Sequence, residues 1–398
     1  MENRPHHESF GWHLLRATPV LLGISLIVHL LFGGVLLLSA DTAALDSFLL
    51  LRTPHRAERI AIVVIDEVDY RELFHSRSPL DPVRLQGILD AIAAGRPALL
   101  AVDLDTSALE LRDLHTPAGI PVVWARGAHE IEPGQLVMEP VLGGQEPPLT
   151  GLAGVMPDSD GIVRRYLRSF PIHGGETFNY QIARGVATPC LRRDLAQEDP
   201  EPLHHGEPAA LLYDFGGGAA SLPRYPARLI LDGVRNAETW GRNGPLTGRI
   251  VLLGGTYHAA RDRYVTPLGP LAGVDLVALA VETDLSCRGV REAAHWVLGV
   301  LDLASGTLLV FLHYMSMQRR WPLRRVVLLS MVAIPVLAVV ASAVVFHTAG
   351  YWLNSLPLLV GVFIHQLYDH GRQYRKLYLS ELALSKPSSS QSSRTSGA

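Results

Sequence analysis

The stretch SMQRRWPLRR, residues 316–325, separates two long apolar runs, and the arrangement of the whole chain follows from it. The runs are residues 295–315 and 326–346, each about 20 residues long and so able to cross a hydrocarbon core as a helix. The stretch between them carries four arginines and no acidic residue, whereas residues 347–350 carry no Lys, Arg, Asp or Glu. The positive-inside rule therefore predicts that 316–325 lies in the cytoplasm and 347–350 outside it.

Two further apolar runs complete a prediction of four spanning helices. Residues 20–40 form the first span and residues 351–369 the fourth, so the lead 1–19 and the tail 370–398 both fall in the cytoplasm. A cleaved signal peptide is the alternative for the first run, but its length favours an uncleaved anchor. In either case residues 41–294 are exported.

Composition excludes a simple soluble protein and disfavours a nucleic-acid partner. Apolar residues make up 48% of the 398 residues and gather in these runs, and a net charge of −3 comes without a basic stripe interleaved with aromatic residues. Lysine occurs only at Lys376 and Lys386, a bias typical of GC-rich bacteria, so we expect a multi-pass protein of the bacterial inner membrane. Cys190 and Cys287 both lie in the exported region, where a disulfide can form.

Residues 41–294 are numerous enough for a single α/β domain with its own core. The runs 60–65 and 98–104 are continuously apolar, as strands buried on both faces are, and residues 82–94 between them have helical spacing. Strand, helix and strand in this order form a βαβ unit, in which the two strands are parallel. Gly95 is the expected stop of the helix.

Beyond Val122 the pattern is weaker and the predicted elements are shorter. Strands are expected at 163–170, 211–215, 229–231 and 249–253, helices at 178–186 and 274–285, and a polar surface loop at 191–207. The predicted fold class is therefore an α/β extracytoplasmic domain with a mainly parallel sheet, joined to four transmembrane α-helices.

Polar residues follow the three best-defined strands. If these strands are parallel neighbours, the residues meet at the carboxyl edge of the sheet, where α/β folds bind ligands. Carboxylates there could hold a divalent cation or a cationic ligand, while the competing interpretation is that Asp66 and Asp103 cap turns or helices. The candidate ligand-binding residues are Asp66, Asp103, Asp105, Gly254, Gly255, Thr256, Asp262 and Thr266.

The other motifs in the sequence do not predict a metal site or a catalytic site. The sequence DSDG at 158–161 resembles the start of a calcium loop but lacks the remaining ligands, so an Asx turn is the preferred interpretation. We find no nucleophile motif, no phosphate-binding loop and no His or Cys pair at metal-ligand spacing. The sequence therefore predicts no metal, no cofactor and no enzymatic activity.

Asp302 lies inside the apolar run 295–315, where an ionised carboxylate costs about 3 kcal/mol. It either faces the helix bundle or lies near the outer interface and reaches water. The polar residues that could surround it in a bundle are Ser305, Thr307, His29 and His365.

The tail sequence RQYRKLYLSELAL, residues 372–384, predicts a cytoplasmic extension of the last helix. With Arg372, Arg375 and Lys376 it could bind anionic membrane lipids or dock a separate cytoplasmic output protein. Residues 388–398 are rich in serine, which is typical of disordered segments.

The segment GRIVLLGGTYHAARDRYVTPLGPLAGVDLVALAVETDL, residues 248–285, resembles the signature end of the second class of CHASE domains, extracytoplasmic sensors associated with cyclases and histidine kinases. The order of one anchor, a sensor and three closely spaced helices is also similar. Four further segments fit, namely AIVVIDEVDY (61–70), LLAVDLD (99–105), DSDGIVRRY (158–166) and LLYDFGGGAASLPRYPA (211–227).

The chain departs from that family pattern at three places. SRSPL at 76–80 stands where a Trp-Pro-Trp-Pro-Arg element is expected, and VAL at 277–279 where a His-Ala-Asn step is usual. Residues 370–398 are too few for a cyclase, kinase or phosphatase domain. The resemblance thus implies a sensor that detects an unknown extracytoplasmic ligand and signals to a separate partner.

Two alternatives from other classes remain open. The first is a membrane-tethered exported enzyme that uses Asp66 and Asp105, and the second is a transporter built around Asp302, for which four spans are few unless the protein forms a homo-oligomer.

Overall fold

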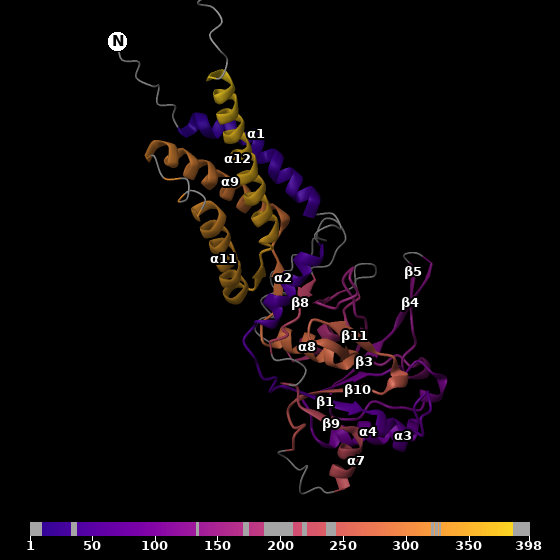
Figure 1. Cartoon of the computed structure of the whole chain (residues 1–398). Helices are drawn as coiled ribbons and strands as arrows, with labels where there is room; N and C mark the ends of the chain where they lie inside the picture. Colours follow the sequence, from indigo (N-terminus) through magenta and orange to yellow (C-terminus); the bar gives the residue numbers. More distant parts are fainter. Residues whose placement is uncertain are drawn as a thin grey trace, which may run out of the picture. The chain divides into compact units, whose positions relative to one another are not determined.

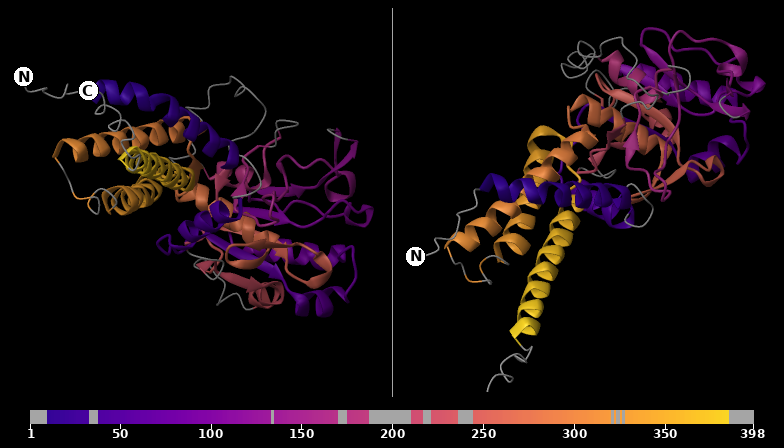
Figure 2. Two further views of the ribbon diagram at one scale, coloured as in Figure 1. Left: turned by 45° about the horizontal axis from the view of Figure 1, so that its top comes forward. Right: turned by 90° about the horizontal axis from the view of Figure 1, so that it is seen from above.

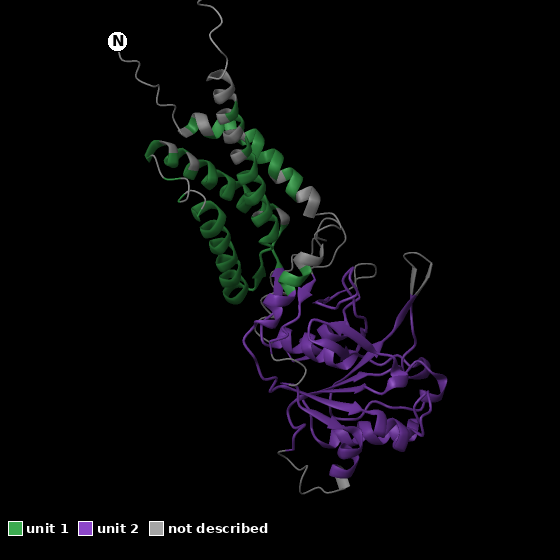
Figure 3. Ribbon diagram, viewed as in Figure 1, with its two compact units in different colours: residues 1–45, 292–398 green, residues 46–291 purple. Residues whose placement is uncertain are grey.

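The computed structural model describes the chain apart from residues 1–9, 33–37, 133–134, 170–174, 187–209, 217–220, 236–243, 320–321, 323–324, 326–327 and 385–398. It divides into two compact units (Figure 3). One, which we call the sensor unit, is Asp46–Arg291, and the other, the helix unit, is Met1–Leu45 with Glu292–Ala398.

A six-stranded parallel sheet forms the middle of the sensor unit, in the order β6-β3-β2-β10-β1-β9 (Figure 1). Its strands are β1 Ile60–Ile65, β2 Leu99–Asp103, β3 Val122–Arg126, β6 Thr150–Leu152, β9 Arg224–Pro226 and β10 Ile250–Gly255. The predicted parallel sheet is confirmed, and β10 lies between β1 and β2. Because Gly255 pairs with Ile65 and Gly254 with Asp103, the three strands end together.

Helices cover both faces of this sheet. On one face α3 Glu67–Phe74, α4 Pro82–Ala94 and α7 Ala227–Arg235 enclose the main apolar core. On the other, α8 Gly273–Leu285 packs on β10 and β1, and α5 Phe178–Gly185 packs on α8 and on β3. The helix predicted at 82–94 has these bounds because the Asp81 carboxylate accepts the Arg84 backbone N–H at 2.9 Å and Pro82 occupies its first turn.

The strands predicted beyond Val122 are only partly present in the structure. Residues 229–231, predicted as a strand, lie in α7, because Ala227, Ile230 and Leu231 point to the core at helical spacing while Leu229 is exposed. The predicted strand is three residues long, which is less than one helical turn, so the helical spacing of the apolar residues could not be recognised. Of the strands predicted at 163–170 and 211–215, only β7 Arg165–Tyr166 and β8 Leu211–Leu212 form ladders, in a small antiparallel sheet with β13 Val290–Glu292.

The remaining elements of the sensor unit are short. Two antiparallel hairpins, β4 Ala128–Glu132 with β5 Gln135–Met138 and β11 Arg263–Thr266 with β12 Gly269–Ala272, have no counterpart among the predictions. The same is true of α2 Leu38–Leu50, which leads into this unit. The predicted loop 191–207 lies outside the described residues.

The helix unit contains α1 Phe10–Phe32, α9 His295–Arg319, α11 Ile334–Ala349 with the π-helical turn Leu329–Ala333 before it, and α12 Leu356–Leu384. α1, α9 and α12 pack on one another, and α11 packs on α12. Figure 2 shows α12 as one continuous helix, drawn in yellow.

Two of the four predicted membrane spans are found in the described part of the chain. In the described part of the chain two stretches, Trp296–Ser316 and Leu329–Ala349, are long and apolar enough to span, and those in α1 and α12, Leu14–Val28 and Leu359–Tyr368, are shorter. The fourth predicted span starts late because Tyr351–Trp352 form β14 and the Asn354 side chain accepts the Leu356 N–H at 3.1 Å, which caps α12.

Candidate functional site

A cavity of about 310 Å³ lies at the carboxyl edge of the parallel sheet. Its walls are the residues that follow β2, β3, β5, β6 and β10. Four acidic residues line it: Asp103, Asp105, Glu139 and Asp262. Of the predicted ligand-binding residues, the structure thus brings together Asp103, Asp105, Gly255 and Asp262 around one space.

Asp103 is the last residue of β2 and the most perturbed acid of this cavity. Burial, together with the negative charge of Asp262, raises its pKa to about 7. Burial also raises the pKa of Asp262 above its usual value, although the Tyr264 hydroxyl and the Gly273 backbone N–H donate hydrogen bonds to it. Two carboxyl groups that both resist ionisation therefore face the same space, and a cation bound there would favour the ionised form of each.

The other two acids are held by their own loops. The Asp105 carboxylate accepts hydrogen bonds from the Ser107 backbone N–H at 2.9 Å and from its hydroxyl at 2.7 Å, which makes an Asx turn. The Glu139 carboxylate lies 3.6 Å from His129 Nδ1 and crosses directly over Gly127. Glu139 escaped prediction because the hairpin that positions it shows no clear alternation in sequence.

Tyr257 forms another part of the wall and was also not predicted. Its ring stacks on Tyr70 with centroids 4.1 Å apart. Burial raises the pKa of the Tyr257 hydroxyl to about 12, so this hydroxyl is a neutral hydrogen-bonding group at the edge of the cavity. Tyr257 lies in the segment GGTYHAARD, directly after a buried strand. This position at the end of a strand could have indicated that it lines the site.

Gly254, Gly255 and Thr256 serve the packing of the sheet. A Cβ on Gly254 would lie 2.6 Å from the Val274 side chain, so glycine allows β10 to approach α8. A Cβ on Gly255 would meet the Tyr257 ring at 2.8 Å. The Thr256 N–H donates to the Ile65 carbonyl at 3.0 Å and so extends the ladder with β1.

Asp66 lies outside the cavity lining, and the structure gives it the role of a helix cap. Its carboxylate accepts the Asp69 N–H at 2.8 Å at the start of α3 and pairs with Arg228 at 2.8 Å. Burial acts to raise the pKa of Asp66, but these hydrogen bonds outweigh it and hold the pKa below its usual value. The carboxylate is therefore occupied by protein groups.

Thr266 and the DSDG motif also have structural partners. The Thr266 hydroxyl donates to the Gly269 carbonyl at 2.7 Å and accepts the Leu268 N–H, which closes the β11–β12 turn. In the motif, Asp160 accepts the Ile162 N–H as an Asx turn does. Asp160 and Asp158 both pair with the buried guanidinium of Arg164.

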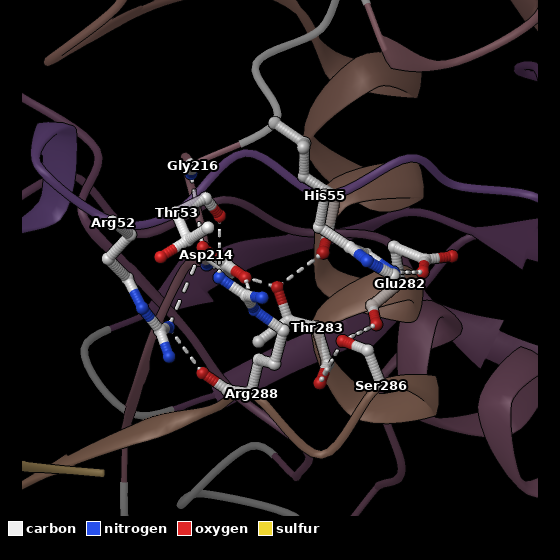
Figure 4. A network of polar contacts seen from close by, with 10 residues as sticks. Arg52, Thr53, His55, Asp214, Gly216, Glu282, Thr283, Ser286 and Arg288 are labelled. Carbon is white, nitrogen blue, oxygen red and sulfur yellow. Dashed lines mark hydrogen bonds and ion pairs between the residues drawn. The ribbon is translucent and has the colours of Figure 1, made fainter. Parts of the chain in front are cut away.

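A polar network connects the start of the sensor unit with its end (Figure 4). The Arg52 guanidinium donates to the Arg288 carbonyl, and Arg288 in turn pairs with Asp214. His55 lies 2.9 Å from Glu282, whose pKa burial raises although His55 opposes the shift. The segment after α2 is thus bonded to the end of α8 and to the residues that lead out of the unit.

Metal ions in proteins are usually held by several His, Cys, Asp or Glu side chains. Among the described residues no group of three or more His, Cys, Asp or Glu side chains could hold a metal ion. Cys287 is disulfide-bonded, and Cys190, the other cysteine of the sequence, lies outside the described residues.

In the helix unit Asp302 faces the bundle, at 8% exposure, and shares a small cavity with Ser305 and His365. The Thr307 hydroxyl instead donates to the Leu303 carbonyl of its own helix. The side chain of His29 is outside the described part of the chain.

On α12, Arg375 is exposed, and nothing is described of the side chains of Arg372 and Lys376. Their roles in binding lipid or a partner therefore stay predictions.

Comparison with known proteins gives one match. The family model described as the CHASE2 domain matches residues 21–333, which include the whole sensor unit and all of α9. No curated protein and no solved structure matches the chain.

Proposed function

The chain belongs to the CHASE2 domain family, and on that basis we propose that it is a membrane-bound sensory protein whose sensor unit detects a ligand outside the cytoplasm and signals to a separate cytoplasmic partner. CHASE2 domains are extracellular sensory domains, so a sensory role follows from the family. The identity of the ligand class, the route of the signal and the existence of a separate partner are our proposals.

The observation that carries the proposal is the acidic cavity at the carboxyl edge of the sheet. Its volume of about 310 Å³ suits a small molecule, and parallel α/β sheets bind ligands at this edge. Asp103 and Asp262 favour a ligand with a positive charge, such as an organic amine, because a cation would offset the repulsion between them. The ligand class is therefore a small organic cation.

Binding can act as a signal only if two states of the protein differ in affinity for the ligand. The network of Arg52, Asp214 and Arg288 supports a mechanical route, because it bonds the segments that enter and leave the sensor unit to each other. A change at the carboxyl edge would reach these segments through α8, which packs on β10 and ends beside the network.

Binding would be tested on the full-length protein in lipid nanodiscs, by thermal shift against a panel of small organic amines. We expect at least one amine to raise the melting temperature, and the substitution Asp103→Asn to weaken its binding about tenfold, the loss of roughly one charge-assisted contact. Asp90→Asn, on the exposed face of α4, is the matched control and should leave binding unchanged. A panel without effect, or equal losses in both variants, would contradict the cationic ligand.

The output would be tested by crosslinking in cells and affinity purification of the full chain and of a chain that ends at Gly371. α12 continues to Leu384, so the shorter chain lacks its last turns. A kinase, cyclase or other effector recovered only with the full chain would support a separate output protein. Equal recovery from both chains would exclude docking on residues 372–384.

The alternative of an exported enzyme using Asp66 and Asp105 gains no support from the arrangement. Asp105 lines the cavity, whereas Asp66 caps α3 and pairs with Arg228, so the two carboxylates do not share a site. No specific observation favours turnover.

A further inference from the structure

A second pocket of the sensor unit, with a volume of about 600 Å³, lies where β1 begins, and we call it the α8 pocket. One of its walls is formed by residues 54–59, which lead into β1, and the other by the end of α8, with Glu282, Leu285 and Ser286. No residue lines both this pocket and the acidic cavity at the carboxyl edge. The α8 pocket is therefore a separate space, large enough for a small organic molecule.

The wall that leads into β1 presents three exposed charged side chains, those of Arg56, Glu58 and Arg59. Although Glu58 is next to Arg59 in the sequence, none of the three side chains forms an ion pair or a hydrogen bond with a described residue. Each guanidinium thus keeps all its N–H donors, in the planar arrangement that binds a carboxylate through two hydrogen bonds. This wall is suited to a carboxylate.

The wall formed by α8 has the opposite polarity. Glu282 Oε1 lies 2.9 Å from His55 Nε2, whereas Glu282 Oε2 has no hydrogen-bond partner among the described residues (Figure 4). The helix ends here, so its dipole adds a partial negative charge. Burial raises the pKa of Glu282, while the hydrogen bond of His55 and the charge of Arg59 oppose the shift, so the two walls are close enough to interact. A cationic group is favoured on this side.

A ligand with a single charge suits only one wall. The arginines would repel a simple cation, and Glu58 and Glu282 would repel a simple anion. An α-amino acid carries a carboxylate and an ammonium group on the same carbon atom. We propose that the α8 pocket binds an α-amino acid, whose carboxylate pairs with Arg56 and Arg59 and whose ammonium group faces Glu282 and the end of α8. Such a ligand would join the segment that leads into β1 to the end of α8, and its binding does not depend on the cation proposed for the acidic cavity.

The test is isothermal titration calorimetry of the full-length protein with each of the standard L-amino acids as the probe. Nanodiscs of phosphatidylcholine, which has no net charge, keep anionic headgroups away from the arginines. We expect at least one amino acid to bind, and both its N-acetyl derivative and the amine that lacks its carboxylate to bind at least about tenfold more weakly. Absence of binding for the whole panel up to about 10 mM, or equal binding of the N-acetyl derivative, would overturn the proposal.

Variants locate the binding site. Arg59→Gln should weaken binding of the amino acid about tenfold, the loss of roughly one charge-assisted pair, and combining it with Arg56→Gln should abolish binding. Arg84→Gln is the matched control and should bind as the wild type does, because Arg84 is also exposed but lies on α4, away from the pocket. Asp103→Asn should also leave binding unchanged. Binding that is lost in Asp103→Asn but kept in Arg59→Gln would place the amino acid in the acidic cavity and overturn the proposal.

Discussion

The carboxyl group of Asp103 is neutral at a pH where most aspartates are ionised. Burial and the charge of Asp262 raise its pKa from 3.8 to about 7. Between these two pH values the folded protein keeps a proton that the unfolded chain has released, so the free energy of unfolding falls as the pH rises from about 4 to about 7. The shift corresponds to at most about 4 kcal/mol.

Asp103→Asn should therefore stabilise the protein at about pH 8 by up to that amount and change little at about pH 3. Asparagine is neutral at every pH and has nearly the same shape. The measurement is the thermal unfolding midpoint of both proteins across this pH range, taken as a difference so that other acids cancel. A constant difference between the two proteins would contradict the raised pKa.

Arg164 is a buried cation that is held by hydrogen-bonded ion pairs. Its guanidinium is 1% exposed and pairs with three carboxylates, those of Asp46, Asp158 and Asp160. Together these partners raise the pKa of Arg164 further above its usual value, although burial opposes the shift. The partners come from two segments far apart in sequence, so the ion pairs connect the end of α2 with the DSDG turn.

Arg164→Met should lower the free energy of unfolding by about 3–5 kcal/mol, because it removes the buried guanidinium that neutralises the partly buried carboxylates of Asp46 and Asp160. Chemical denaturation of the full chain in detergent measures this loss. Arg112→Met is the control, since Arg112 is exposed and its pair with Asp113 is worth about 0–1 kcal/mol. Similar losses in both variants would show that burial of Arg164 has no energetic consequence.

At the scale of elements, the close contact between β10 and α8 depends on Gly254. The two elements approach until a Cβ at this position would overlap the Val274 side chain, at 2.6 Å. Both are well-packed parts of the core, since β10 is buried along its whole length. The contact also connects the carboxyl edge, with its acidic cavity, to the helix that ends beside Arg52 and Arg288.

Gly254→Ala should destabilise the protein by about 1–3 kcal/mol through overpacking. Gly87→Ala in α4 provides the matched control: the nearest atom to its Cβ is 3.8 Å away, and alanine should stabilise that helix by about 1 kcal/mol. Opposite signs of the two effects in thermal unfolding are the expected result. If Gly254→Ala were also stabilising, the backbone approach would be looser than the structure shows.

The molecule as a whole consists of two compact units that differ in what they contain. The sensor unit holds the parallel sheet and the acidic cavity, and the helix unit holds the two stretches that are long and apolar enough to span a membrane. The topology predicted from the sequence with four spans puts the sensor unit outside and the end of α12 in the cytoplasm.

This topology predicts opposite labelling of two single-cysteine variants in intact cells. A membrane-impermeant maleimide should label Asp90→Cys from outside and should reach Arg375→Cys only after the membrane is permeabilised. Both positions are exposed, and Cys287 is disulfide-bonded, so the native background is low. Labelling of Arg375→Cys in intact cells would reverse the predicted orientation.

Local sequence patterns were enough to predict the main strands and helices of the sensor unit. Continuous apolar strands at β1, β2 and β10 and the helical period of α4 and α8 predicted a parallel α/β sheet, and the strand ends predicted its carboxyl edge. The signature at 248–285 indicated the family. These predictions succeed because buried parallel strands and amphipathic helices each have a distinct period in their apolar residues.

Which polar groups face a common space depends instead on contacts between segments far apart in the chain. Asp66 follows β1 and Asp103 ends β2 at the same edge of the sheet, yet Arg228, from a helix far away in sequence, pairs with the first, while Glu139, next to an unpredicted hairpin, lines the same cavity as the second. Likewise the small cavity at Asp302 exists because three helices meet there. Hydrogen bonds and charges act through space between residues far apart in the chain, so no local pattern records them.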